Sequence, residues 1–366
     1  MTRFAQVPFD EALEDATGGN AKVLTSSLSS SGKYAVVDQG QQFVSGYVND
    51  ANLLYRRNGE PIILFGDHTK IIKYIDFDFV LGADGVKALK SRPGFHPRYL
   101  LHYLHCIPLP NNLGYSRHFK YLKAVTVPKP PLDEQERIAA VLDKADAIRK
   151  KRREALKLAD DFLRSVFLNL FGDPVTNPKE WPTEQMGRVC SFYAGNSLPD
   201  GEPFIEQPGG VLHLKVGDMN LPGNEEIVLI AREWSEKAQG AIVAPAGAVL
   251  LPKRGGAIAT NKKRILCRPC ALDPNLMAVS PKAPLSIEYL YAWFGLFDLT
   301  TISSGSAVPQ LNKGDLAPLR IQIPPETLLK KYSVVATKVK AMISTYREQL
   351  EDAEALFSAL QQQAFA

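Results

Sequence analysis

The chain has 366 residues, 45% of them hydrophobic, which is enough apolar material for two globular domains of ordinary size. Its formal net charge of +4 permits a nucleic-acid partner without requiring one, so local charge clusters must decide. No apolar run approaches the roughly 18 residues that cross a bilayer, and no signal peptide is recognised. The composition therefore predicts a cytoplasmic protein with no membrane partner, which folds without disulfide or metal support.

The first stretch, residues 1–128, has short apolar runs broken by Gly, Pro, Asn and Asp, which is typical of short strands and turns. Apolar and polar residues alternate over residues 71–79, and this predicts a strand that ends before the turn at residues 82–85. Residues 97–104 have the pattern of a short helix. We therefore expect a mixed α/β domain.

A polar run of strong helix formers follows the prolines Pro130 and Pro131. It predicts a helix of roughly 40 residues within the segment 129–172. Residues 172–182 then contain three prolines, which must end the helix and form a linker.

The segment 173–322 returns to the mixed composition of the first stretch. Residues 241–244 and 248–251 predict a strand, a turn and a second strand, and residues 286–295 predict a short helix. A second long helical run fills the segment 323–366, so the expected order is domain, helix, domain, helix.

The two helical runs are copies of one element. The proline pair at 130–131 recurs at 324–325, an offset of 324 − 130 = 194 positions. At this single offset Val141 aligns with Val335, Leu156 with Leu350 and Phe171 with Phe365, without gaps. Such a match indicates a pseudo-symmetric chain with one long helix in each half.

Apolar residues in both runs alternate steps of three and four, which is the seam spacing of a coiled coil. Arg149 and Arg152 interrupt the first seam, so the interface cannot be wholly apolar. Helices of this length are not stable alone in water, so we expect the two to pack antiparallel. The alternative, two unrelated surface helices, leaves the shared offset unexplained. The predicted seam residues are Ile138, Leu142, Leu156, Leu163, Val166, Val339, Ile343, Tyr346, Leu350, Phe357 and Leu360.

These patterns predict an α+β fold class. Two pseudo-symmetric mixed α/β domains are separated by two long helices that form an antiparallel coiled coil.

Motifs of the common catalytic classes are absent from the sequence. It has no Gly-rich phosphate-binding loop ending in Gly-Lys-Ser/Thr, no Gly-x-Ser-x-Gly elbow and no His-Glu-x-x-His zinc motif. Cys267 and Cys270 have zinc-knuckle spacing but lack a second pair, so no metal site is expected. We interpret the chain as non-enzymatic by itself.

Basic residues with amide neighbours lie in loop-like segments of both halves. Arg reads guanine, Asn reads adenine, and Lys neutralises phosphate, so these side chains suit DNA. The alternative is a solvated cationic turn, or, for His68 and His118, a structural histidine. His118 aligns with Asn312 at the repeat offset, so polar loops precede both long helices. The candidates are His68, Lys70, Lys73, Arg92, Arg98, Ser116, Arg117, His118 and Lys120 in the first half, and Lys253, Arg254, Asn261, Lys262, Lys263, Gln310, Asn312 and Lys313 in the second.

Four segments resemble a known family. Residues 130–139 (PPLDEQERIA) and 167–174 (FLNLFGDP) resemble the central helix of the specificity subunits of type I restriction-modification enzymes. Residues 305–316 (GSAVPQLNKGDL) and the following 323–325 resemble the end of their second target-recognition domain. The resemblance covers essentially the whole chain.

The resemblance implies two target-recognition domains, residues 1–128 and 173–322, each reading one half of a split asymmetric DNA sequence. The helices at 129–172 and 323–366 would set the spacing. It further implies two methyltransferase subunits as partners, and restriction subunits bound through them. No cofactor is expected on this chain, whereas S-adenosylmethionine, ATP and Mg are expected on the partner subunits.

The second helix departs from the family pattern at its start. Residues 326–332 read ETLLKKY where residues 132–138 read LDEQERI, so the two methyltransferase docking surfaces need not be equivalent. The alternative function is a non-catalytic protein-interaction scaffold, with two ligand-binding domains joined by a coiled coil. That function accounts for the repeat but not for the paired basic loops.

Overall fold

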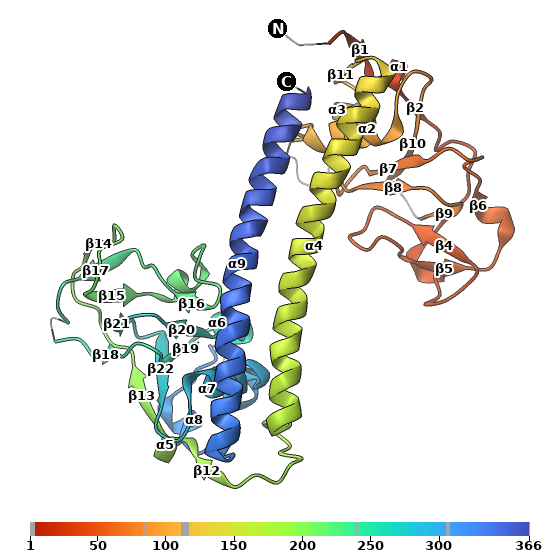
Figure 1. Ribbon diagram of the computed structural model, residues 1–366. Coiled ribbons are helices and arrows are strands. Elements are labelled where there is room, and N and C mark those ends of the chain that lie inside the picture. Colours follow the sequence, from red (N-terminus) through yellow and green to blue (C-terminus); the bar gives the residue numbers. More distant parts are fainter. Residues whose placement is uncertain (1–3, 83–84, 111–116, 239, 305–307, 366) are drawn as a thin grey trace. The chain divides into compact units, whose positions relative to one another are not determined.

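A computed structural model describes residues 4–82, 85–110, 117–238, 240–304 and 308–365. The chain divides into two compact units (Figure 1). Unit 1 comprises Met1–Arg153 and Glu348–Ala366, and unit 2 comprises Glu154–Arg347. Each unit therefore contains one globular domain and one half of each long helix.

The two predicted long helices are α4 (Leu132–Phe171) and α9 (Glu326–Phe365), with 40 residues each. Pro131 precedes α4, and its carbonyl accepts a hydrogen bond from the Gln135 N–H at 3.0 Å. Gly172 follows α4 with φ of +81°, and its N–H donates to the Leu168 carbonyl at 2.9 Å. Proline before the first turn and a left-handed glycine after the last are the expected helix ends.

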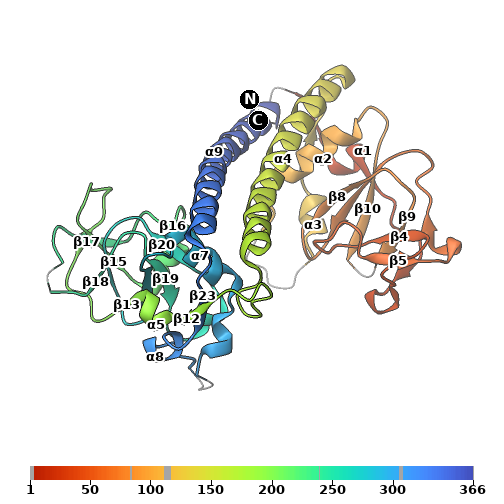
Figure 2. The same ribbon diagram turned by 60° about the horizontal axis from the view of Figure 1, so that its bottom comes forward.

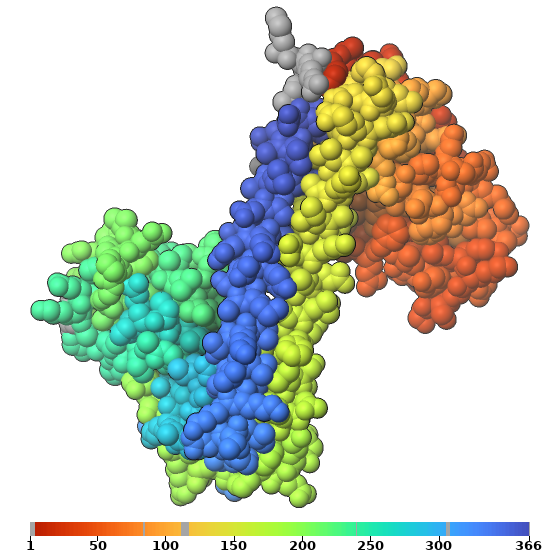
Figure 3. Space-filling view, viewed as in Figure 1, coloured from red at the N-terminus to blue at the C-terminus, as the bar shows by residue number. Residues whose placement is uncertain are grey.

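Within each unit the two helix halves pack antiparallel. In unit 1, Ile138 and Leu142 near the start of α4 share a core with Phe357 and Leu360 near the end of α9. Figure 3 shows the start of α4, in yellow, side by side with the end of α9, in blue. In unit 2, Phe167 near the end of α4 stacks edge-on against Tyr332 near the start of α9, with 5.6 Å between ring centroids. The predicted α+β fold with an antiparallel helix pair is confirmed.

The seam residues differ in burial along the helices. Ile138, Leu142, Val339, Ile343 and Phe357 are buried. Leu156, Leu163, Val166, Tyr346, Leu350 and Leu360 are half-buried. Arg149, which interrupts the predicted seam, lies over the Phe357 ring at 3.9 Å and pairs with Asp146 at 2.7 Å. An arginine can occupy this position because its guanidinium stacks on an aromatic face.

Unit 1 contains two main sheets. The first has the order β2-β10-β7-β8, all antiparallel, and α2 packs on it (Figures 1 and 2). The second has the order β3-β9-β4-β5, with β6 also paired to β9, and β1 pairs with β11. The elements are β1 (Gln6–Pro8), α1 (Phe9–Ala12), β2 (Leu13–Asp15), β3 (Lys22–Val23), η1 (Thr25–Ser27), β4 (Tyr34–Val37), β5 (Gly46–Val48), η2 (Ala51–Leu53), β6 (Leu54–Tyr55), β7 (Ile62–Gly66), β8 (Ile72–Ile75), β9 (Phe79–Gly82), β10 (Val86–Ser91), α2 (Pro97–Cys106), α3 (Phe119–Leu122) and β11 (Thr126–Pro128).

Unit 2 repeats this plan with additions. Its first sheet has the order β13-β22-β19-β20-β16, with α7 packed on it, and its second has the order β14-β17-β15-β21-β18. The pair β12-β23 corresponds to β1-β11. The elements are β12 (Thr183–Gln185), α5 (Met186–Val189), β13 (Cys190–Ala194), β14 (Glu202–Pro203), β15 (Val211–Leu214), η3 (Val216–Asn220), β16 (Ile227–Val228), β17 (Glu233–Ser235), β18 (Val243–Ala244), β19 (Val249–Pro252), α6 (Gly256–Ala259), β20 (Arg264–Leu266), β21 (Cys270–Leu272), β22 (Leu276–Pro281), α7 (Ile287–Leu296), η4 (Leu299–Ile302), α8 (Lys313–Leu316) and β23 (Arg320–Gln322).

The offset of 194 extends beyond the long helices. The elements α8, β23 and α9 each begin 194 residues after α3, β11 and α4. A tyrosine on the preceding helix makes the same bond in both units. The Tyr99 hydroxyl donates to the Pro128 carbonyl at 2.9 Å, and the Tyr289 hydroxyl donates to the Gln322 carbonyl at 3.1 Å. Each domain is thus fastened to the segment that leads into its own long helix.

One local strand prediction is wrong and a second is confirmed, but neither predicted the sheet that its strands join. The run at 71–79 is divided between β8 and β9, which belong to different sheets, and Asp78 between them accepts the Arg57 N–H at 3.2 Å. The predicted strand, turn and strand over residues 241–251 is confirmed by β18, a turn at residues 246–247 and β19, although the two strands do not pair with each other. β18 pairs with β21, and β19 pairs with β20 and β22. Alternation predicts where a strand lies, whereas long-range partners decide which sheet it joins.

Candidate nucleic-acid interface

The end of β19 brings two predicted loops of unit 2 together. Arg254 forms an isolated antiparallel bridge with Gln310. On either side of it, the Leu311 N–H donates to the Lys253 carbonyl at 2.9 Å, and the Gly255 N–H donates to the Pro309 carbonyl at 2.8 Å. Residues some 56 positions apart in sequence therefore form one short ribbon, here called the unit 2 ribbon (residues 253–255 and 309–311).

Polar residues continue beyond the unit 2 ribbon. The Asn312 N–H donates to Asp315 Oδ2 at 2.6 Å, which fixes the start of α8, and Asn312 and Lys313 are both exposed. The Ser304 N–H donates to the Gln310 carbonyl at 3.0 Å and closes the preceding loop. Arg254 is exposed, and within the described part of the chain its guanidinium has no carboxylate partner. A cationic and amide-bearing surface results.

Unit 1 has a counterpart at the end of β7. The His118 N–H donates to the Asp67 carbonyl at 2.8 Å, and the Phe119 N–H donates to Asp67 Oδ1 at 2.7 Å. The hairpin turn is closed by the Lys70 N–H, which donates to the Gly66 carbonyl at 2.8 Å, with Lys70 at φ of +61°. The structure therefore brings the hairpin with His68 and Lys70 beside the loop before α3.

The histidines of this loop differ in exposure. His118 is buried, with 3% of its surface exposed, whereas His68 is half-buried. Loss of hydration, together with the nearby Lys70, lowers the pKa of His118. A buried imidazole with a lowered pKa is neutral at pH 7, so His118 fits the structural alternative better than a phosphate contact.

Other candidates of the first half stay at the surface. Arg117 and Lys120 are exposed, and Lys120 lies over the Tyr121 ring at 4.8 Å. Arg92 is exposed with Glu14 at 3.9 Å. Ser116 lies outside the described residues.

Three candidates are corrected, because they bond to the protein itself. The Lys73 ammonium is buried and donates to the Asp38 carbonyl at 2.8 Å. The Lys263 ammonium is buried and donates to the Phe297 carbonyl at 2.8 Å, and burial lowers its pKa to about 8. The Asn261 amide bonds Phe297 and Leu299. These side chains hold loops in place, which corrects their prediction as DNA contacts.

Arg98 and Lys262 are also engaged within their units. The Arg98 guanidinium lies over the Tyr74 ring at 3.9 Å and is 3.8 Å from the Asp143 carboxylate on α4. Lys262 donates to the Asn220 side chain. Arg98 therefore connects α2 and β8 to the long helix, which is a structural role.

Each domain is fastened to the helix pair by a polar contact that the sequence did not reveal. In unit 1, His102 Nε2 on α2 lies 2.8 Å from Asp143 Oδ1 on α4. In unit 2, the Lys340 ammonium on α9 pairs with Glu226 at 2.8 Å and lies 4.8 Å from the Tyr291 ring centroid. We call these contacts the unit 1 and unit 2 fasteners. No local pattern marks them, because each joins segments over 40 residues apart.

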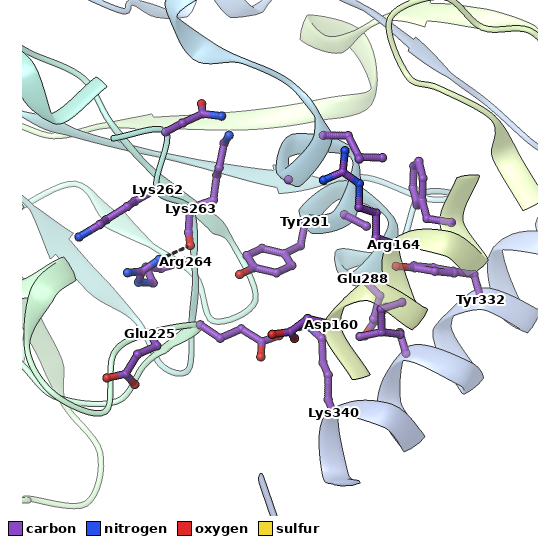
Figure 4. A pocket seen from close by; sticks show the side chains of 18 of the residues that line it. Asp160, Arg164, Glu225, Lys262, Lys263, Arg264, Glu288, Tyr291, Tyr332 and Lys340 are labelled. Atoms are coloured by element: carbon purple, nitrogen blue, oxygen red, sulfur yellow. Dashed lines mark hydrogen bonds and ion pairs between the residues drawn. The ribbon is translucent and has the colours of Figure 1, made fainter. Parts of the chain in front are cut away.

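The unit 2 fastener borders a cavity of about 430 Å³. Figure 4 shows Lys340, Tyr291 and Asp160 converging on it, with Lys263 and Arg264 on another wall. The lining mixes acidic, basic and aromatic groups from the domain and from both long helices.

Gln135 of the family-like motif has a structural explanation. Its side chain is fully buried, donates to the carbonyls of Gly94 at 3.0 Å and Pro130 at 2.9 Å, and accepts the His96 N–H at 2.8 Å. Leu329, at the same repeat position in α9, is buried in an apolar core. The departure at the start of the second helix thus replaces a polar anchor by an apolar one.

Among the described residues, no helix is both long and apolar enough to cross a bilayer. Among the same residues, no three His, Cys, Asp or Glu side chains converge in a way that could hold a metal ion. Cys270 is buried and Cys267 is exposed.

Comparisons with known proteins agree with this architecture. Residues 8–158 match the type I restriction modification DNA specificity domain. The chain is 21% identical over 312 residues to the type I restriction enzyme EcoR124I/EcoR124II specificity subunit of Escherichia coli, covering 79% of this chain and 75% of that protein. It is 22% identical over 252 residues to the type I restriction enzyme MjaIX specificity subunit of Methanocaldococcus jannaschii, covering 62% of this chain and 57% of that protein.

A solved structure supports the fold as well. The type I restriction-modification system S subunit from M. genitalium matches with a TM-score of 0.65 at 12% identity, covering 100% of this chain and 96% of that one. Residues 8–158 thus match the DNA specificity domain of type I restriction-modification systems, and the chain as a whole is similar in sequence and fold to type I specificity subunits.

Proposed function

We propose that this chain selects the DNA sequence on which a type I restriction-modification complex acts. Each domain would read one half of a split, asymmetric target. The observation that carries the proposal is the repeated placement of a polar loop against a strand end. The loop before α8 bonds the end of β19, and the loop before α3 bonds the end of β7. The two loops carry different side chains, as two unlike half-sites require.

The long helices would act as the spacer between half-sites. Each has 40 residues, which corresponds to a length of about 60 Å at about 1.5 Å per residue. A rigid spacer multiplies two weak specificities while holding constant the number of unread base pairs between them. This part of the proposal is supported by the continuous helices and by the shared repeat.

The partners belong to the proposal as well. Two methyltransferase subunits would dock on this chain, and restriction subunits would bind through them. S-adenosylmethionine, ATP and Mg would reside on those subunits, and this chain would be non-catalytic. Support comes from the family-like residues 130–139, whose Gln135 joins helix and domain.

A map of methylated adenine across the host genome tests the proposal. We expect deletion of the gene to abolish methylation at one split, asymmetric motif, and expression of the intact chain from a plasmid to restore it. A protein-interaction scaffold predicts an unchanged map. If the map is unchanged while the partner methyltransferase is expressed and active, the proposed function is wrong.

A further inference from the structure

We infer that Arg254 and Gln310 act as a pair that reads two neighbouring base pairs of one half-site, Arg254 a G·C pair and Gln310 an A·T pair. The inference rests on the proposed function and deepens it. It differs from a general basic surface because it assigns base types to two named side chains. The juxtaposition that carries it is their antiparallel bridge at the end of β19.

The backbone of the unit 2 ribbon holds both side chains on one face. Residues directly opposite in an antiparallel bridge project from the same face, with Cβ atoms about 4.5–5.5 Å apart. The hydrogen bonds Leu311 to Lys253 and Gly255 to Pro309 lie on either side of the bridge and hold the register. The register is therefore decided before DNA binds, which lowers the entropic cost of recognition.

The spacing of the pair matches stacked bases. Successive base pairs are about 3.4 Å apart along the duplex, and the major groove admits a two-stranded ribbon. Long side chains that start about 5 Å apart can reach adjacent base pairs. Arg bonds guanine O6 and N7 with two donors, and Gln bonds adenine N6 and N7 with one donor and one acceptor.

The surroundings leave the pair available. Arg254 is exposed and Gln310 is half-buried. The β19 residues before the ribbon are buried in the sheet, so the ribbon is carried on a rigid base. Lys313, exposed on the first turn of α8, is placed to contact a phosphate beside it.

Among the described residues of unit 1, no bridge equivalent to Arg254–Gln310 is present at the end of β7, and Ser116, which aligns with Gln310 at the repeat offset, lies outside them. There the strand end bonds the loop through Asp67 and His118, and both side chains are buried. The Asp67 carboxylate already accepts the Phe119 N–H at 2.7 Å. The inference therefore concerns one half-site only, and the other half-site provides an internal control.

The test is adenine-methylation mapping in a deletion strain that expresses variants of the full chain with its partner subunits. Arg254→Ala should relax one G·C position of one half-site, and Gln310→Ala should relax the adjacent A·T position. Loss of one such pair of base contacts corresponds to a drop in discrimination of about 5- to 150-fold at that position. The other half-site should be unchanged.

Arg254→Lys separates base reading from charge. Lysine keeps the positive charge but cannot form the two-pronged contact in the same way, so it should restore methylation yield without restoring discrimination. Lys313→Ala is the matched control and should lower yield at all sites without changing the motif. The opposite outcome is that Arg254→Ala loses methylation yield while Arg254→Lys recovers both the full yield and the original motif. That result would assign Arg254 to a phosphate contact and overturn the inference.

Failure of the inference is distinguishable from failure of the proposed function. If the unaltered chain restores no motif, the proposed function fails. If it restores a motif that Arg254→Ala and Gln310→Ala leave intact in both half-sites, the inference is wrong and the proposed function stands. If the two variants relax positions that are not adjacent, the pairing is wrong.

Discussion

The two units share a topology but fasten the domain to the helix pair with opposite charges. In unit 1 the long helix supplies an acid, Asp143, and the domain supplies His102. In unit 2 the long helix supplies a base, Lys340, and the domain supplies Glu226. The pseudo-symmetry therefore lies in the helix repeat and the strand order, whereas the residues of the fastener differ between the two units.

The starts of the long helices are also anchored differently in the two units. Gln135 satisfies two carbonyls and one N–H of the first domain, whereas Leu329 packs among apolar side chains of the second. A buried side-chain amide is stable only when its donors and acceptors are hydrogen-bonded, whereas a buried leucine requires only close packing of apolar atoms around it. The same step of the repeat is therefore built from directional bonds in unit 1 and from packing in unit 2.

The largest expected effect is on the core that unit 1 shares with α9. Phe357 is 5% exposed and carries Arg149 over its ring at 3.9 Å. Phe357→Ala should cost about 3–5 kcal/mol of local stability, because it leaves a cavity and an unstacked cation. Hydrogen exchange measured across α4 and α9 reports this loss in unit 1. Leu356→Ala, at a neighbour that is 55% exposed, is the control and should change exchange little.

Exchanging the two helix starts should give the next largest effect. Gln135→Leu leaves the His96 N–H and the carbonyls of Gly94 and Pro130 without their partner, at a cost of about 1–3 kcal/mol. The reciprocal Leu329→Gln buries an unpartnered amide and should also destabilise. Urea unfolding followed by hydrogen exchange of each unit checks both. If either substitution leaves the free energy of unfolding unchanged, the polar and the apolar anchor are interchangeable and the contrast between the units is wrong.

The unit 1 fastener should be sensitive to acid. Burial lowers the pKa of His102 below its usual 6.5, although Asp143 opposes the shift. The unfolded chain thus binds a proton near pH 6.5 and the folded chain only at lower pH, so stability falls as pH drops through this range. His105 nearby has a lowered pKa for the same reason and contributes in the same direction.

Amide exchange near Asp143, corrected for intrinsic rates, should therefore accelerate between pH 7.5 and 5.5. The amides around Lys340 provide the comparison, because its contact with Glu226 holds no histidine. His102→Gln should reduce the pH response of unit 1 and leave part of it, due to His105. If amide exchange in His102→Gln accelerates with acid as much as in the unaltered chain, titratable groups other than His102 cause the effect.

The unit 2 fastener should give the smallest effect. Its charged groups are 21% and 16% exposed, so solvent screens the ion pair only in part. Lys340→Met keeps the aliphatic stem over Tyr291 and removes the charge, and it should cost up to about 1 kcal/mol. Lys338→Met, at an exposed position two residues away, is the matched control. Thermal unfolding of the pair of variants measures the difference, and equal melting temperatures would mean that the ion pair contributes nothing.

The sequence places the candidate residues in loops but does not show which of them lie together or which remain exposed. Arg254 and Gln310 are separate candidates in the sequence, and the structure adds that they form one bridge. Lys73 and Lys263 have the same local pattern, yet both ammonium groups are buried on carbonyls 34 or 35 residues away. A lysine in a loop-like segment has the same local pattern whether its end is solvated or enclosed.

By itself, the sequence determined the two long helices, their ends and their repeat, because helix propensity, proline placement and seam spacing are local properties. Only the tertiary structure decided which strands share a sheet, which cations remain exposed and how each domain is fastened to its helix. Those outcomes depend on partners distant in the chain, such as Glu226 for Lys340 and His102 for Asp143. Burial and pairing are properties of a packed surface, which no short stretch of sequence contains.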